Sequence, residues 1–248
     1  MKISIIGAGL FLFTFSTWAG AFLETFDDGD LADWQEFNAR DAVPGSWEIL
    51  DGELEGTNPG GGARFLTTGD ETWQDYSIEV NVNPLEKLGP GHIAIAARVE
   101  GGQAISCRIS DLFLNDPVSK VLCMVRDFDK NIAEVLYVEP HPLLRMNKWS
   151  RLKLNVNGDH FILWINGKKI VETGDPFNFV LEDQEVELKA QDLSFHSTGA
   201  GGAGFGLANY TARFDNITII GDGIPDKGGL SVLPRAKLTT TWANLKRF

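Results

Sequence analysis

The strongest constraint on how this chain can fold is a strict alternation of apolar and polar side chains. It is clearest in residues 76–82, and it recurs in residues 149–156, 161–165 and 214–219. Successive side chains of an extended strand point to opposite faces, so each run predicts a β-strand with one buried face. Residues 22–220 contain no convincing ten-residue stretch with the period of an amphipathic helix, so we expect little helix.

Turn signals separate these alternating runs. The dipeptides Asp51-Gly52, Asn157-Gly158 and Asn166-Gly167 are typical of tight turns between strands. The runs add up to roughly a dozen strands, a number that favours two packed sheets over one open sheet. The sequence therefore predicts an all-β domain made of two antiparallel sheets.

The N-terminus has the pattern of a cleavable secretory signal peptide over residues 1–21. Lys2 precedes an apolar run over residues 3–15, and Ala19 and Ala21 supply small side chains at the expected cleavage point. The apolar stretch is about 16 residues long, shorter than the roughly 20 of a spanning helix, so a retained anchor is the weaker alternative. We expect a secreted, periplasmic or cell-surface protein whose mature part has no membrane span.

The charge of the chain argues against two classes of partner. It contains 22 basic and 34 acidic residues, a net charge of -12, so nucleic acid and anionic membranes are poor partners. The glycines of residues 199–204 fit a phosphate-loop spacing, but a strand pattern follows where a helix N-terminus would be needed. We therefore expect no organic cofactor.

Two segments depart from the strand pattern. Residues 176–202 form a long excursion rich in acids and aromatics, for which a surface loop or an extra hairpin is the simplest explanation. From residue 221 the composition is that of a linker, and the chain ends in a basic tail. We expect a folded domain at residues 22–220 and a linker with tail at residues 221–248.

A set of segments, in a defined order and spacing, connects these strands to a known fold. The segments are residues 24–29 with Trp34, 47–54, the strand pair 92–99 and 103–109 with Arg98 near the end of an apolar run, 149–154 leading to 163–167, and 204–207 followed by 214–217. Together they resemble the concanavalin A-like (laminin-G-like) jelly roll of secreted carbohydrate-binding modules and 3-keto-disaccharide hydrolase-type domains. The resemblance implies an all-β, two-sheet antiparallel jelly-roll sandwich, and it says less about activity.

The resemblance also implies a structural calcium ion. Many relatives hold one where the N-terminal strand meets the last strand, with carboxylate and carbonyl oxygens as ligands. Carried over by position, Asp215 is a side-chain ligand, and Glu24, Asp27 or Asp28 completes the set. The alternative is that the aspartates near the N-terminus solvate a turn and that Asp215 is a paired edge residue.

The chain has two cysteines, Cys107 and Cys123, on strands that we expect to be neighbours. An even number of cysteines in an exported protein permits a disulfide. The alternative is a pair of buried thiols that act as small apolar side chains.

A candidate ligand site follows from the alternation and from the resemblance. Jelly rolls of this kind offer a shallow trough on the concave sheet, and alternation places His92 and Arg98 on one face of the same strand. Arg108 and Arg126 continue a cationic row on the next two strands, and Trp164 offers a ring for stacking against a sugar. The alternative is that these arginines pair with acids on a solvated sheet and that the 176–202 excursion covers the indole.

The predicted function is carbohydrate binding, with a polysaccharide or oligosaccharide on the concave face. The first alternative is a glycoside hydrolase of the 3-keto-disaccharide hydrolase type, for which no catalytic residue can be assigned. The second alternative is an envelope module that recognises protein through the same sheet or through the basic tail. The sequence leaves the oligomeric state open.

Overall fold

The computed structural model describes residues 19–39, 43–112, 118–128, 132–181, 184–189 and 199–227. The described residues contain strands and no helix, as the alternation predicted. The strands are β1 (Ala19–Glu24), β2 (Gln35–Asn38), β3 (Ser46–Leu50), β4 (Glu53–Asn58), β5 (Arg64–Thr68), β6 (Tyr76–Glu100), β7 (Gln103–Ser110), β8 (Lys120–Asp127), β9 (Ile132–Pro140), β10 (Ser150–Asn157), β11 (His160–Ile165), β12 (Lys168–Glu172), β13 (Pro176–Leu181), β14 (Gln184–Lys189) and β15 (Gly202–Asp222).

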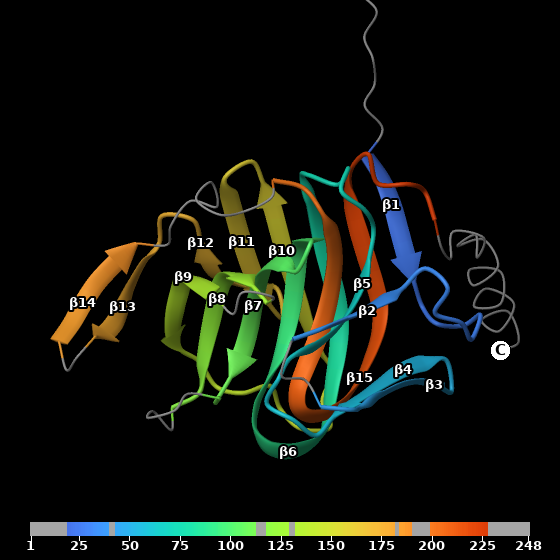
Figure 1. Ribbon diagram of the computed structural model, residues 1–248, viewed down its shortest axis with the longest axis horizontal. Coiled ribbons are helices and arrows are strands. Elements are labelled where there is room, and N and C mark those ends of the chain that lie inside the picture. Colours follow the sequence, from blue (N-terminus) through green and yellow to red (C-terminus); the bar gives the residue numbers. More distant parts are fainter. Residues whose placement is uncertain are drawn as a thin grey trace, which may run out of the picture.

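Two long strands connect both layers of the sandwich. β6 has 25 residues and β15 has 21, and they pair antiparallel along most of their lengths with several register shifts. The first half of β6 lies beside the second half of β15 in one layer, and their other halves lie together in the second layer (Figure 1). Hydrogen bonding is therefore continuous between the two sheets.

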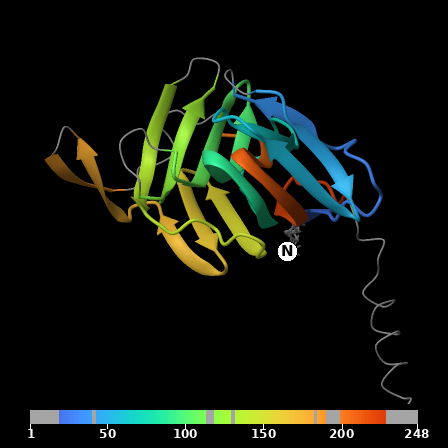
Figure 2. The same cartoon turned by 90° about the horizontal axis from the view of Figure 1, so that it is seen from below.

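The layers follow from the pairing of these two strands. The front sheet has the order β2-β5-β15-β6-β7-β8-β9, and the back sheet has the order β12-β11-β10-β6-β15-β1. The β3-β4 hairpin pairs with the middle of β15. Figure 2 shows β7 to β9 and β10 to β12 in two separate layers. The predicted two-sheet antiparallel sandwich is confirmed.

The core lies between the sheets and is built by the alternating residues. On β6, Ile78, Val80 and Val82 are fully buried, and on β10 Leu152 and Leu154 are fully buried against them. Burying each such side chain contributes about 1.5 to 3 kcal/mol, so the period-2 pattern alone fixes which side of each strand faces inward.

The ends of the described chain pack together. β1 begins at Ala19 and pairs with the end of β15, so the strand starts three residues before the predicted mature N-terminus. The backbone N–H of Leu23 donates to the carbonyl of Lys227 at 2.9 Å, and Ile224 is buried. The segment up to residue 227, predicted as a linker, is thus part of the fold.

The 176–202 excursion contains a separate hairpin formed by β13 and β14. It projects from the end of the sandwich beyond β12 (Figure 1). This agrees with the extra-hairpin explanation. No helix within the described residues is long and apolar enough to cross a membrane.

Candidate functional site

The candidate site lies on the side of the front sheet that points away from the main core, which we call the front face. His92 of β6, Ser106 and Arg108 of β7, and Arg126 of β8 share this side. The register accounts for it, because Arg108 pairs with Ala94, which lies two residues from His92 on the same strand. Of the cationic row that the sequence predicted, the register places His92, Arg108 and Arg126 on this one side.

The polar side chains of the front face are buried and incompletely hydrogen-bonded. His92 is 1% exposed, Arg108 is 6% exposed and Ser106 is fully buried. Both ring nitrogens of His92, the Oγ of Ser106 and the Nε of Arg108 have no hydrogen-bond partner. Arg108 Nη2 donates to Sδ of Met124, a weak acceptor, at 2.9 Å. Nearly all buried polar groups in folded proteins are satisfied, so a cluster of unsatisfied ones at this place is unusual.

Burial and like charges set the protonation of this cluster. Burial lowers the pKa of His92 well below its usual value, and the positive charges of Arg108 and Arg126 lower it further. Burial, followed by the charge of Arg126, lowers the pKa of Arg108 to about 10. At neutral pH His92 is therefore an uncharged imidazole beside guanidinium groups. Its ring can accept a hydrogen bond, and the neighbouring guanidinium groups can stabilise negative charge.

The rest of the front face is apolar. Ala94 and Ala96 are fully buried members of a second apolar cluster, distinct from the main core. Phe37 of β2 and Phe65 of β5 belong to the same cluster, and their rings pack around Phe128 with centroid distances of 5.0 and 5.7 Å. The sequence predicted room above the small residues, and these rings occupy part of it. The result is an aromatic wall beside buried cations.

Arg98 does not belong to the front face, and its predicted place in the row is wrong. A register shift follows Ala97, and Arg98 has a φ of 51°. Its side chain therefore does not point to the side of the sheet that the alternation predicts. Its Nη2 donates to the carbonyl of Gly158 at 2.8 Å, and its Nε donates to the carbonyl of Gln74 at 3.2 Å. Asp75 completes an ion pair with it at 3.3 Å. Arg98 thus joins the β5–β6 loop to the β10–β11 turn and has a structural role.

Trp164 also lies away from the arginines. It is on β11 of the back sheet, where Leu163 and Ile165 face the core and Trp164 faces outward. Arg108 faces outward from the front sheet, so the whole thickness of the sandwich separates the two side chains. The prediction that one ligand touches both is therefore wrong. Alternation identifies a face within a strand, but it does not identify the layer to which the strand belongs.

The residues predicted to bind calcium lie at the junction of β1 and β15. Burial raises the pKa of Asp215, and the negative charges of Glu53, Asp27 and Glu24 raise it further, so these four carboxylates lie near one another. Glu24 already accepts hydrogen bonds from the backbone of Phe26 and from the Trp34 indole. Asp28 Oδ1 accepts from the backbone of Asp30 at 3.3 Å.

Among the residues that the structure describes, no three acidic, histidine or cysteine side chains could hold a metal ion. The donor set as placed does not fit a closed calcium site. Calcium binding by Asp215, Asp27, Asp28 and Glu24 stays a prediction, which thermal unfolding with and without EDTA tests directly.

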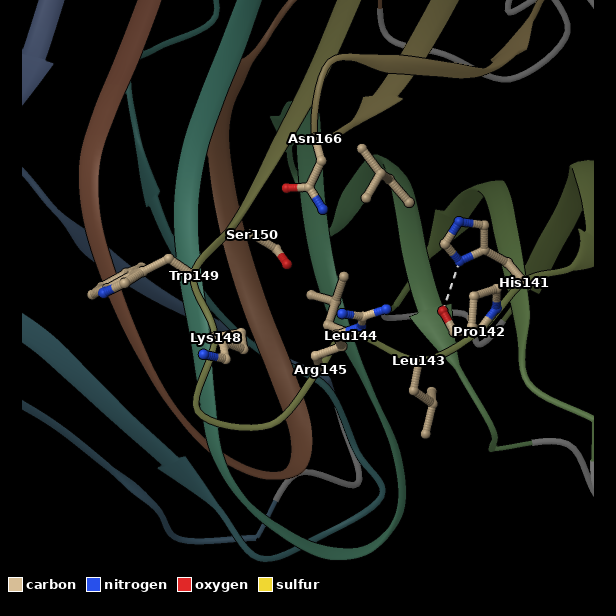
Figure 3. A pocket seen from close by; sticks show the side chains of 10 residues that line it. His141, Pro142, Leu143, Leu144, Arg145, Lys148, Trp149, Ser150 and Asn166 are labelled. Atoms are coloured by element: carbon tan, nitrogen blue, oxygen red, sulfur yellow. Dashed lines mark hydrogen bonds between the residues drawn. The ribbon is translucent and has the colours of Figure 1, made fainter.

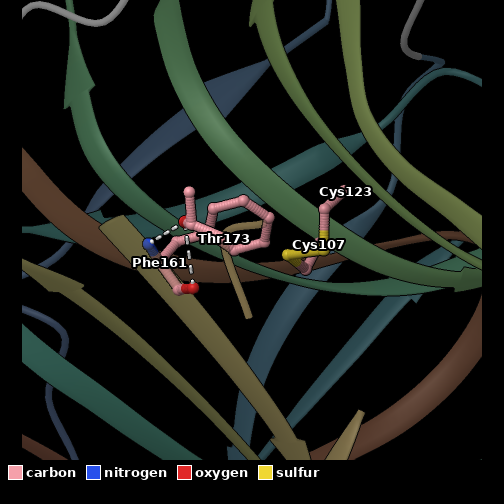
Figure 4. The surroundings of a disulfide bond; sticks show 4 residues. All are labelled: Cys107, Cys123, Phe161 and Thr173. Atoms are coloured by element: carbon pink, nitrogen blue, oxygen red, sulfur yellow. Dashed lines mark hydrogen bonds between the residues drawn. A yellow bond between two sulfur atoms is a disulfide. The ribbon is translucent and has the colours of Figure 1, made fainter. Parts of the chain in front are cut away.

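A disulfide lies directly beneath the front face. Cys107 and Cys123 are opposite each other on β7 and β8, and their sulfur atoms are bonded, so of the two alternatives left open the structure contains the bridge. Both residues are fully buried. Figure 4 shows the ring of Phe161 from the back sheet directed toward the bridge. The bond fixes the two strands that carry Arg108 and Arg126.

Some residues of the front face were missed. Ser106 and Phe128 each lie two residues from a predicted arginine, so alternation alone would have placed them on the same side. The rings of Phe37 and Phe65 belong to β2 and β5, which reach the front sheet only through β15. No local sequence pattern reveals that pairing.

Fold and site together define the class of this protein. Two antiparallel sheets sharing long central strands, with buried polar groups on one outer face, make it a concanavalin A-like jelly-roll domain. Comparison with family models is more specific: the chain belongs to the family of 3-keto-alpha-glucoside-1,2-lyase-like domains, whose model matches residues 21–220. The resemblance inferred from the sequence motifs is thereby confirmed. No curated protein matches this chain.

Solved structures support the same fold. A galectin-like protein of unknown function from Bacillus subtilis superposes with a TM-score of 0.54 and 14% identity, covering 83% of this chain and 97% of that chain. The carbohydrate-binding module CBM66 from Bacillus subtilis gives 0.51 and 17%, covering 77% and 96%. The carbohydrate recognition domain of Emp46p in its metal-free form gives 0.51 and 13%, covering 78% and 90%. At these identities the likeness shows the fold alone.

Proposed function

We propose that this domain binds a carbohydrate on its front face. The observation that carries the proposal is the group of buried, unsatisfied polar atoms on His92, Ser106 and Arg108. Sugar hydroxyls both donate and accept hydrogen bonds, so they satisfy a neutral imidazole, a hydroxyl and a guanidinium at once. The apolar C–H face of a sugar ring suits the partly exposed ring of Phe37 at the edge of this cluster. CBM66 and the Emp46p domain, which share the fold, support a sugar ligand by analogy.

The chemistry of the front face favours binding over hydrolysis. Glycoside hydrolases commonly use two carboxyl groups, one as acid and one as base or nucleophile. On the described residues of β7, β8 and the second half of β6, the side chains that share the side of Arg108 include no aspartate or glutamate. The arginines instead suit a ligand rich in oxygen acceptors, or one that carries an anionic group.

A second candidate function is elimination from a 3-keto-α-glucoside, the chemistry named in the family description. In that reaction a base removes the proton on C2, which the neighbouring ketone acidifies. The electron pair forms the C1–C2 double bond, the C1–O bond breaks, and the departing oxygen takes up a proton. In this candidate function the uncharged imidazole of His92 would act as the base, and Arg108 would stabilise the enolate oxygen.

A test of the binding proposal uses Arg108→Met, which removes a buried charge and keeps a side chain of similar length. We expect the variant to lose binding to the glycan that wild type selects on an array. Its free energy of unfolding should rise by about 1 kcal/mol or more, because a buried, poorly paired cation has been replaced by an apolar group. Calorimetric titration and urea unfolding measure the two effects.

The matched control is Arg213→Met, which removes an arginine that is paired with Glu53 and Glu55 outside the front face. It should retain binding and gain no stability. Full binding by Arg108→Met would overturn the proposed site. Release of product from a 3-keto-α-glucoside by wild type, lost in His92→Gln, would establish the elimination instead.

We also propose that the protein is exported. The support is the signal-peptide pattern at residues 1–21 together with the Cys107–Cys123 bridge, since disulfides persist mainly in oxidising compartments. N-terminal sequencing of the protein recovered outside the cytoplasm should begin near Phe22. Recovery of the chain in the cytoplasm with its first residues intact would contradict export.

A further inference from the structure

The outer side of the back sheet carries a second group of side chains suited to ligand binding, which we call the back face. Its centre is a row across three strands, in which Trp164 of β11 lies between Lys153 of β10 and Lys169 of β12. The Lys153 Nζ lies 5.8 Å from the centre of the indole. Arg151, two residues before Lys153 on β10, extends the row along the strand and is 55% exposed.

The charge of this region is opposite to that of the whole chain. Residues 145–169 hold six of the 22 basic residues and a single acid, Asp159, although the chain carries a net charge of -12. Three acids partly balance the row. Glu79 lies 3.5 Å from Arg151, Glu172 lies 2.7 Å from Lys169, and the charge of Asp175 also acts on Lys169. Residues 145–169 are thus a locally cationic segment of an acidic protein, and Arg151 and Lys153 of the back face belong to it.

The surface is hollowed at the indole. A shallow pocket of about 350 Å³ is lined by Glu79, Arg151, Lys153, Trp164 and Gly167. A second pocket of about 390 Å³ lies on the other side of the Asn166-Gly167 turn, at the β9–β10 loop. Figure 3 shows Arg145 and Asn166 beside this second pocket, with the Trp149 indole pointing away from the other side chains. Trp149 is 44% exposed, so two accessible indoles flank the cations of β10.

We propose that the back face binds an acidic polysaccharide. One sugar ring stacks on Trp164, and its carboxylate or sulfate group contacts the ammonium of Lys153 or Lys169. An indole surrounded by cations combines the two contacts that a charged sugar offers, namely an apolar ring face and an anionic group. This site is separate from the front face and does not depend on the function proposed there.

The charge distribution favours a polysaccharide over other polyanions. A membrane surface or a nucleic acid duplex presents dense negative charge to a whole side of the protein, where the net charge of -12 opposes it. Electrostatic interactions are screened beyond about 8 Å at physiological salt, so a single extended chain lying along the row experiences mainly the local cations.

The test measures equilibrium binding of the protein to polygalacturonate, in which each ring bears a carboxylate. The comparison ligand is the fully methyl-esterified polymer, which keeps the rings and loses the charge. We expect binding to the acid form only, weakened severalfold when NaCl rises from about 0.05 to about 0.5 M. Dextran sulfate and plain dextran form a parallel pair, and selective binding to dextran sulfate would support the same proposal with sulfate as the recognised group.

Variants locate the site. Trp164→Ala and the double variant Lys153→Gln/Lys169→Gln should each weaken binding about tenfold, the effect of losing one good stacking or charge contact. The control Lys87→Gln removes one positive charge outside β10 to β12 and should change the affinity less than about twofold. Equal binding to the esterified polymer, full binding by Trp164→Ala, or binding only to anionic lipid vesicles or single-stranded DNA would each overturn the proposal.

Discussion

The front and back faces carry similar residue types in opposite physical states. On the front face, His92 and Arg108 are buried, and both ring nitrogens of His92 and the Nε of Arg108 have no hydrogen-bond partner. On the back face, Arg151 and Lys169 are about half exposed and each lies beside a glutamate. A buried polar group without a partner costs free energy, whereas an exposed cation is solvated at almost no cost.

This difference gives each face its own mutational signature. Removing Arg108 should stabilise the fold while it abolishes ligand binding, because its guanidinium is buried and its Nε has no hydrogen-bond partner. Removing a back-face cation should leave stability unchanged and weaken only a salt-sensitive interaction. Stability and binding measured together therefore separate the two faces better than either measurement alone.

The largest effect should come from Arg98, which belongs to neither face. Arg98→Met removes hydrogen bonds to the carbonyls of Gly158 and Gln74 and the ion pair with Asp75. Because these partners lose a buried cation, we expect the free energy of unfolding to fall by about 3 kcal/mol. Urea unfolding measures the loss. Arg213 is less buried, so Arg213→Met should lower the free energy of unfolding by no more than about 1 kcal/mol. Equal losses in the two variants would contradict the structural role given to Arg98.

An effect of similar size should come from the disulfide, which joins two strands of the front sheet. Cys107→Ala/Cys123→Ala removes a bridge between residues 16 positions apart, and we expect a loss of about 3 kcal/mol. Binding at the front face should weaken, since β7 and β8 carry its arginines, while binding at the back face persists. Reductant should destabilise wild type to a similar extent and have no effect on the double variant. A variant as stable as wild type would contradict this role of the bridge.

The contrast between the faces also shows which parts of the fold and of the candidate site could be predicted from the sequence. Alternation correctly gave the strands, the sandwich, and the common face of His92, Arg108 and Arg126, because a period of two determines which residues share a side. It failed at Arg98, where the backbone enters the left-handed region and the period is lost. It failed again at Trp164, because the layer of each strand depends on long-range pairing with β6 and β15.

The third effect concerns pH and depends on the burial of His92. In the unfolded chain its pKa is about 6.5, whereas in the folded protein burial, Arg108 and Arg126 hold the pKa well below that value. Below pH 6.5 the unfolded state therefore binds more protons than the folded state, and stability falls as the pH falls. The slope reaches about 1.4 kcal/mol per pH unit at most.

Urea unfolding between pH 7.5 and pH 5 measures this slope, and His92→Gln isolates it. The variant cannot titrate at this position, so its stability should decline less steeply than that of wild type over the same range. Groups elsewhere contribute equally to both proteins and cancel in the difference. Identical pH profiles would mean that His92 is accessible to protons in the folded state, and the front face would lose its buried character.

The smallest effect should come from Lys153, and it completes the contrast. Its ammonium lies over the indole of Trp164 at a partly exposed position, where a cation–π contact is worth about 0.5 to 1 kcal/mol. The entropy cost of ordering the long side chain offsets part of that contribution. Lys153→Gln should therefore change the free energy of unfolding by less than about 0.5 kcal/mol. A double-mutant cycle with Trp164→Ala measures the coupling between the two side chains. If Lys153→Gln lowered the free energy of unfolding by more than about 1.5 kcal/mol, Lys153 would have a structural role like that of Arg98. That result would contradict the proposal that the back face is a ligand-binding surface.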